Sequence, residues 1–223
     1  MATSFEVSST IEEYLEAIYR LQERDGAAKT TELAKELKLA LGTITNTIES
    51  MEKQALVEHR PYKGVKLTPK GRKIALDVVR RHRLSERLLV DILRMEWSKA
   101  HDAACKLEHA FADKELSIPL EEALGHPKTC PHGNPIPSES GKLVEERSEV
   151  LLSLETGDKG TIIKVTDERS DILQYLGKLG LVPGAVVEIE EKAPFDGPIM
   201  VRVGNANYAL GRNVASAIWV KKS

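Results

Sequence analysis

The chain of 223 residues carries two sets of potential metal ligands at helical spacing. In the first set, His82 and Glu86 are four residues apart, which places them one turn apart on the same helix face. The second set falls at i, i+4, i+7 and i+8, within one helical stripe, and consists of His101, Cys105, Glu108 and His109. Imidazole, carboxylate and thiolate together favour Fe(II), Mn(II), Co(II), Ni(II) or Zn(II) over Ca(II) and Mg(II). The spacing predicts a transition-metal site, although His82 and Glu86 alone, or His101 alone, also fit surface polar residues.

Two long helices must carry these side chains. We expect the first helix over residues 69–93 and the second over residues 98–113. Pro69 fits the start of the first helix, because the first turn of a helix tolerates proline. A metallohydrolase is the competing class, with His82, Glu86 and His101 as ligands and Glu108 as general base. The sequence offers no Gly-rich phosphate loop or nucleophile motif that would complete such a site, so we expect a protein that is not an enzyme.

The two cysteines, Cys105 and Cys130, are too few for a disulfide framework and are interpreted as thiols or metal ligands. Cys130 lies in a segment, residues 120–140, whose four prolines predict mostly loop. His126 and His132 flank this cysteine. A third metal site is one interpretation of the loop, and an ordinary loop is the other.

The amino-terminal part has the pattern of a helix-turn-helix. Residues 9–26 carry apolar side chains at helical spacing and end on a glycine, and two shorter helices are expected over residues 30–37 and 43–54. A tight turn joins the shorter helices, as in DNA-binding proteins. The start of the third helix carries small polar side chains suited to phosphates and base edges, namely Thr43, Thr45, Asn46 and Thr47.

Residues 56–60 and 64–68 alternate like two strands around Pro61–Gly64, which predicts a β-hairpin with a basic tip, the wing of a winged helix. The net charge of the chain is −2, yet residues 53–87 hold eleven basic and three acidic side chains. Such a local excess attracts phosphates without regard to sequence. The wing bases expected to do so are Arg60, Lys63 and Lys66.

From residue 149 onward, short β-rich runs alternate with turns, which predicts a small SH3-like barrel with one helix near residues 171–179. The expected strands are residues 150–154, 160–165, 186–189, 199–203 and 217–220. A peptide-binding adaptor is a further interpretation of this barrel, with the Pro-rich segment 131–137 as its ligand. Because no run approaches the roughly 18 apolar residues of a membrane-spanning helix and the start lacks a signal-peptide pattern, we expect a cytoplasmic protein.

Taken together, these residues resemble the diphtheria-toxin repressor or iron-dependent regulator family with its manganese-sensing relatives. The most specific segments are residues 81–89, residues 101–109 and the Gly-Asn-Pro-Ile-Pro sequence at 133–137, and the resemblance extends over nearly the whole chain. It implies a mainly α amino-terminal part, with a winged helix-turn-helix and a helical dimerisation domain, followed by an all-β SH3-like barrel. The implied domains are 1–75 for DNA binding, 76–140 for metal binding and dimerisation, a linker at 141–148, and an SH3-like (FeoA-like) domain at 149–223.

The resemblance also implies ligand sets. One metal site would use His82, Glu86 and His101, completed from the barrel, where Glu168 and Asp171 lie near the expected positions. A second would use Cys105, Glu108 and His109 with Glu13 of the first helix. Arg83 and Asn134 would bind an anion near the first site, although Cys130 stands where the family has a serine.

The implied function is a metal-dependent repressor that binds double-stranded DNA with a palindromic operator as a homodimer, with no membrane or small-molecule substrate as partner. Iron-type members have Met where this chain has Glu13, and manganese-type members lack the thiol of Cys105. The chain mixes both patterns, so we favour Fe(II), with Mn(II) as the alternative and Co(II), Ni(II) or Zn(II) able to substitute in vitro. The metal would order the first helix, with Glu16 as a further candidate ligand beside Glu13, and thereby set the spacing of two recognition helices for half-sites about 34 Å apart.

Overall fold

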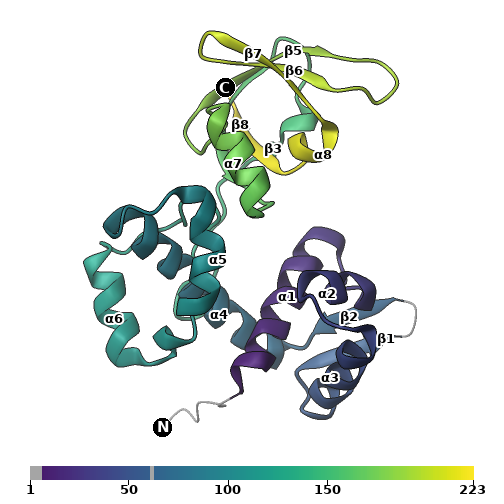
Figure 1. The fold of residues 1–223 in the computed structure, drawn as a ribbon, viewed down its shortest axis with the longest axis vertical. Helices are drawn as coiled ribbons and strands as arrows, with labels where there is room; N and C mark the ends of the chain where they lie inside the picture. Colours follow the sequence, from purple (N-terminus) through teal and green to yellow (C-terminus); the bar gives the residue numbers. More distant parts are fainter. Residues whose placement is uncertain (1–6, 61–62) are drawn as a thin grey trace. The chain divides into compact units, whose positions relative to one another are not determined.

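The computed structural model describes residues 7–60 and 63–223, and the chain divides into two compact units (Figure 1). The first unit extends to Arg81 and includes Pro137–Lys142, and the second comprises His82–Ile136 and Leu143–Ser223. Residues 61 and 62 of the predicted wing tip lie outside the described residues. None of the helices in the described ranges is long and apolar enough to cross a membrane.

The first unit is a helix-turn-helix followed by a β-hairpin. Its helices are α1 (Ser9–Asp25), α2 (Thr30–Glu36) and α3 (Leu41–Lys53), and its antiparallel strands are β1 (Val57–Arg60) and β2 (Gly64–Leu67). Helix α1 ends at Gly26, whose φ of 78° lies in the left-handed region that glycine adopts without strain. The apolar stripes bury Leu15, Ile18, Ile44 and Ile48. These elements confirm the predicted fold, with α3 beginning two residues early.

The hairpin joins α4 (Pro69–Arg87) at a close backbone approach. Thr68 caps the start of this helix by accepting a hydrogen bond from the Gly71 N–H at 3.1 Å. A Cβ on Gly71 would lie 2.0 Å from the Leu56 carbonyl oxygen, which belongs to the backbone and cannot rotate away. Only glycine therefore allows α4 to start this close to the wing.

We expect Gly71→Ala to lower the free energy of unfolding by about 1–3 kcal/mol, because α4 must shift to relieve the overlap with Leu56. Urea denaturation of the purified protein measures the change. The matched control is Gly42→Ala on α3, where a Cβ would have no atom within 4 Å. That substitution is expected to stabilise by about 0.4–1 kcal/mol. Equal effects of the two substitutions would contradict the argument from close approach.

The helical part of the second unit begins with the last turns of α4, which continue through a π-helical turn at Leu88–Ile92. Helix α5 (Trp97–Leu107), a 3₁₀ turn (Ala110–Ala112) and α6 (Lys114–Ala123) follow. The expected single helix over 98–113 is wrong beyond Leu107, and the expected loop from 120 begins only after Ala123. Asp113 caps the start of α6, because its side chain accepts a hydrogen bond from the Glu115 N–H at 2.8 Å.

The remainder of the second unit is a six-stranded antiparallel sheet in the order β3-β8-β4-β5-β6-β7, which confirms the predicted small barrel (Figure 1). The expected strand over 150–154 was wrong, because the run is mostly a 3₁₀ turn (Leu151–Ser153), and β7 is a strand for which no prediction was made. The strands are β3 (Glu149–Val150), β4 (Lys159–Val165), β5 (Val186–Lys192), β6 (Ile199–Val203), β7 (Ala206–Leu210) and β8 (Ile218–Lys222). The barrel also carries helices α7 (Ser170–Lys178) and α8 (Arg212–Ala215).

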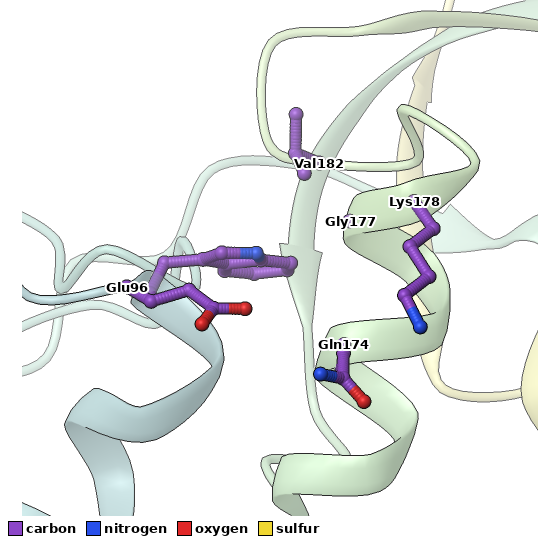
Figure 2. Close-up of a pocket in the computed structure, with 6 residues that line it drawn as sticks. Glu96, Gln174, Gly177, Lys178 and Val182 are labelled. Carbon is purple, nitrogen blue, oxygen red and sulfur yellow. The ribbon is translucent and has the colours of Figure 1, made fainter.

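Helices α5 and α7 meet where Trp97 lies against Gly177. A Cβ on Gly177 would lie 2.8 Å from Trp97 Nε1, so the glycine leaves room for the indole. Figure 2 shows Glu96, next to the start of α5, across from Gln174 and Gly177 on α7, and all three line one pocket. The contact fixes the start of α5, and with it the Trp97 carbonyl, against the barrel.

Candidate metal centre

Four side chains of the second unit converge as a metal site would require. His82 and Glu86 come from α4, His101 from α5, and Glu168 from the segment before α7, and each offers a ligand atom within 4.8 Å of the others. His82 Nε2 lies 3.1 Å from Glu86 Oε1 and 3.0 Å from His101 Nδ1. His101 Nδ1 in turn lies 3.4 Å from Glu168 Oε2. We call these four residues the first cluster.

Glu108 determines which ring nitrogen of His82 carries a proton when the ring is neutral. Its Oε2 lies 2.6 Å from His82 Nδ1, and both side chains are buried. A carboxylate accepts hydrogen bonds, so Nδ1 donates its proton to Glu108, and in the neutral ring Nε2 keeps a lone pair turned to the first cluster. Metal-bound histidines usually have such a carboxylate on the second ring nitrogen. The arrangement prepares His82 Nε2 as a ligand.

Glu86 provides the test of whether this set fits a cation. Burial alone would raise the pKa of Glu86, but the charge of His82 and hydrogen bonds from His101, His132 and His82 hold that pKa well below its usual range. The carboxylate is therefore charged although fully buried. Its Oε2 has no hydrogen-bond partner among the described residues. A buried anionic oxygen without a partner is costly, and a divalent cation would satisfy it, so the donor set fits a metal.

A second group of ligand atoms overlaps the first. Glu86 and Glu168 recur in it, together with Cys130 and His132, and the ligand atoms of these four buried residues again lie within 4.8 Å of one another. We call it the second cluster. His126, the other histidine of the predicted loop site, is 70% exposed at its side chain and lies beside Glu121 instead.

The residues of the second cluster shift one another's pKa values. Burial disfavours the charged form of His132, but hydrogen bonds with Cys130, Glu168 and Glu86 outweigh burial and raise its pKa far above the usual value. Burial raises the pKa of the Cys130 thiol, and the charges of Glu86 and Glu168 add to that shift. Two carboxyl groups and a thiol thus face one histidine in a buried volume, which is a setting that a cation can occupy.

The residues predicted to bind an anion have protein partners. Arg83 donates a hydrogen bond to the Pro135 carbonyl oxygen. Asn134 Nδ2 donates to the Val165 carbonyl oxygen at 2.9 Å and to Glu168 Oε1 at 2.8 Å. Asn134 therefore positions a carboxylate that belongs to both clusters, and its anion-binding role stays a prediction.

The other predicted ligands are dispersed. Cys105 is exposed on α5 and groups with His82 and His101, while His109 Nε2 lies 3.6 Å from Glu108 Oε1. Asp171 is exposed in the first turn of α7, where its side chain accepts a hydrogen bond from the Ile172 N–H, and it is outside both clusters. Glu13 is exposed on α1 in the first unit.

The predicted DNA-contacting side chains lie on the surface of the first unit. Thr43, Thr45 and Asn46 are exposed near the start of α3 and Thr47 is half-buried, while Thr45 Oγ1 donates to the Leu41 carbonyl oxygen at 3.0 Å. The exposed bases of the hairpin are Arg60, Lys63 and Lys66. Their contact with nucleic acid stays a prediction.

Two roles escaped the sequence analysis. Glu108 was assigned as a ligand of its own site, and its hydrogen bond to His82 was not foreseen because 26 residues separate the two. The pairing of Cys130 and His132 with Glu86 and Glu168 was also missed. The available signal was a Cys-x-His sequence in a proline-bounded loop, which is weak without knowledge of what the loop contacts.

Three family models match the chain. Residues 6–65 match the iron dependent repressor, N-terminal DNA binding domain; residues 68–138 match the iron dependent repressor, metal binding and dimerisation domain; and residues 150–222 match the FeoA domain. The matches follow one another along the sequence and together span nearly all of it.

Relatives match over the whole length. The iron-dependent repressor IdeR of Mycobacterium tuberculosis is 32% identical over 97% of this chain and 99% of its own. The diphtheria toxin repressor of Corynebacterium glutamicum is 31% identical over 96% of each chain. A solved structure described as a manganese-dependent transcriptional repressor complex with manganese matches with a TM-score of 0.88 and 33% identity, covering 96% of this chain and 100% of that one. The chain belongs to the iron-dependent repressor family, the family of IdeR and the diphtheria toxin repressor.

Proposed function

We propose that this protein is a metal-dependent transcriptional repressor in which a divalent ion bound at the first cluster is required for tight DNA binding. The observation that carries the proposal is the convergence of His82, Glu86, His101 and Glu168 around a charged, buried carboxylate whose second oxygen lacks a hydrogen-bond partner among the described residues. The helix-turn-helix and basic hairpin of the first unit supply the surface for DNA.

We propose Fe(II) as the physiological metal, with Mn(II) as the alternative. The first cluster offers two imidazoles and two carboxylates, which suit either ion. A nearby thiol, that of Cys105 or Cys130, favours the softer Fe(II). Two of the three relatives named above are described as an iron-dependent and a manganese-dependent repressor, so the family accommodates both metals. Elemental analysis of protein purified without oxygen, from cells supplied with both metals, distinguishes the alternatives.

The family pattern supplies the proposed switch. Cys105, Glu108 and His109 would bind a further ion together with Glu13 of α1, so that metal binding orders that helix and converts binding energy into ordering energy. In a homodimer the position of α1 would set the distance between two α3 helices, and hence the match to half-sites about 34 Å apart. Glu13→Gln would then weaken DNA binding in the presence of metal while the first cluster still binds its ion.

Selection of DNA sequences from a random library tests the proposed DNA partner. Duplexes from a randomised library are enriched by repeated binding to the full chain with Mn(II), and in parallel with a chelator. A homodimer that positions two recognition helices is expected to enrich an inverted repeat in the metal arm alone. Enrichment of the same sequences in both arms, or of no repeat in either, would contradict the proposal.

The hairpin bases provide a separate prediction. Replacing Lys63 and Lys66 together by alanine is expected to reduce the steepness of log Kd against log salt by about two, because each neutralised phosphate contributes roughly 0.9 to that slope. The loss of DNA affinity should be similar for selected and unrelated duplexes. The control replaces Lys221 and Lys222 of β8, exposed bases of the barrel, and should leave the slope unchanged. Equal slopes in wild type and the hairpin variant would rule out the wing contacts.

A further inference from the structure

We propose that Gln22 is a positioning residue that holds the wing on helix α1, so that the phosphate contacts of the wing depend on the helix that metal binding would order. The wing comprises strands β1 and β2 with the exposed bases Lys63 and Lys66. This role rests on the proposed function. It adds a second route, beside the spacing of two α3 helices, by which a shift of α1 would change DNA affinity.

The edge of β2 that faces away from β1 is where the wing meets the segment after α1. The Ala28 N–H donates to the Val65 carbonyl oxygen at 3.0 Å, and the Val65 N–H donates to the Ala28 carbonyl oxygen at 2.8 Å. Because Val65 exchanges both bonds with Ala28, its N–H points away from β1. Backbone groups two residues apart on a strand point to the same side, so the Leu67 N–H also points away from β1. That donor needs an acceptor outside the hairpin.

Gln22 of α1 supplies the acceptor. The Leu67 N–H donates to Gln22 Oε1 at 3.0 Å, and both residues are half-buried. In a longer antiparallel pairing Gly26 would face Leu67, but Gly26 instead ends α1 in the left-handed region. A side chain one turn back in the helix therefore takes the place of the missing backbone acceptor. A partly buried N–H without an acceptor is costly, so this bond holds the base of the wing on α1.

The other end of α1 is tied to helix α4. Arg81 Nη2 donates to Glu12 Oε1 at 2.6 Å, and both side chains are mostly buried. Arg81 directly precedes His82, a residue of the first cluster. Gln22 lies ten positions after Glu12, about 15 Å along a straight helix. Helix α1, which lies beside β2 (Figure 1), thus connects the neighbour of a candidate metal ligand with the wing.

The wing takes its orientation from the contacts at its base. Strands β1 and β2 form four residue pairs. An isolated two-stranded hairpin is only marginally stable in water, so a hairpin this short depends on the elements to which it is bonded. Once released from α1, Lys63 and Lys66 would have to be ordered when DNA binds, and that entropy cost would lower DNA affinity.

The test measures DNA binding by the full-length protein with Mn(II) and a selected duplex. Gln22→Leu removes the acceptor and keeps a good helix former. We expect it to reduce the steepness of log Kd against log salt by about one to two, and to weaken binding near physiological salt about 5–30-fold. Gln22→Glu keeps an oxygen for the Leu67 N–H and should restore the wild-type slope. The control is Gln54→Leu, whose side chain bonds only to Ser50 of its own helix, and it should leave the slope unchanged.

A comparison in two backgrounds separates positioning of the wing from general weakening of the fold. When Lys63 and Lys66 are both replaced by alanine, adding Gln22→Leu should change DNA affinity by less than about twofold, because the wing no longer contacts phosphates. A substitution that merely loosened the fold would lower affinity by the same factor in both backgrounds. Such equal losses, an unchanged slope in Gln22→Leu, or a Gln22→Glu protein as weak as Gln22→Leu would overturn the proposal.

The same assay with a chelator tests the dependence on metal. Without an ion, α1 would not hold the wing in its DNA-binding position, so Gln22→Leu should weaken binding by less than about twofold. An equal loss with Mn(II) and with the chelator would show that the wing contacts are independent of metal, and would overturn the coupling while the proposed function stands. If wild-type protein bound the duplex equally under both conditions, the proposed function would fail, and the role of Gln22 in it as well.

Discussion

Glu86→Gln is expected to lower the affinity of the protein for Fe(II), Mn(II) and Co(II) by about 100-fold or more, which exceeds the usual effect of losing a residue that only supports a ligand. The reason is that Glu86 belongs to both clusters and is the charged, fully buried group whose second oxygen lacks a hydrogen-bond partner among the described residues. Glutamine keeps the shape of the side chain and removes its charge. Competition against a fluorescent chelator measures the affinity.

A matched control accompanies this variant. Glu121→Gln makes the same chemical change beside another histidine of the second unit, since Glu121 Oε1 lies 3.6 Å from His126 Nδ1. Neither residue belongs to the clusters, so metal affinity should stay within about twofold of wild type. Similar affinities for the Glu86 and Glu121 variants would show that the convergence around Glu86 is structural rather than metal-binding.

The second large effect concerns Glu108. Glu108→Gln is expected to weaken metal binding by about 10–100-fold, because His82 loses the charged acceptor that holds its ring and raises its basicity as a ligand. Glu108→Ala should weaken metal binding further, since it also removes the oxygen that accepts the hydrogen bond from His82. Metal-dependent DNA binding should fall in the same order, while both variants remain folded by circular dichroism.

His109→Ala separates two roles for Glu108. If Glu108 acts through His82, the Glu108 variants should weaken Co(II) binding at the first cluster and His109→Ala should not. If it serves only the site implied by the family pattern, the two residues should behave alike. Full metal-responsive DNA binding in both Glu108→Gln and His109→Ala would contradict the proposed switch altogether.

Local periodicity was sufficient for the parts of the site that lie on regular helices. His82 and Glu86 share a face because they are four residues apart, and His101 was found on the next helix. Glu168 was one of two acids proposed near the expected position. Asp171 could not be eliminated, because a long loop, β3, a 3₁₀ turn and β4 separate both acids from the helices. Glu168 precedes α7 and reaches the cluster, whereas Asp171 lies in the first turn of α7 and stays exposed, a difference that spacing alone does not reveal.

The second cluster could not be assembled from local sequence patterns. Cys130 and His132 lie in an irregular loop, and their partners Glu86 and Glu168 are about 40 residues away on either side. Nothing in the local sequence indicates that Gly133 lets the loop approach β4 closely enough to bring the four together. Tertiary contacts of this kind become visible only when the backbone is placed.

The fold was predicted best where apolar patterns were strong. The helix-turn-helix, the hairpin and most barrel strands followed from periodicity, whereas β7 was missed because its sequence, Ala-Asn-Tyr-Ala-Leu, lacks β-branched residues. Helix α6 was not predicted, because residues 114–119 were left unassigned and residues 120–123 were included in the loop expected from the four prolines. The first of those prolines, Pro127, lies after the end of the helix, so the loop was expected to begin too early.

The central claim is that a divalent ion at the first cluster is required for tight DNA binding. Fluorescence anisotropy with a selected duplex tests this claim most directly. Wild-type protein should bind the duplex about 10–100-fold more tightly with Mn(II), or with Fe(II) under anaerobic conditions, than with a chelator. Glu86→Gln should bind weakly under all of these conditions. Equal affinity of wild-type protein with metal and with chelator, or an undiminished metal response in Glu86→Gln, would contradict the account.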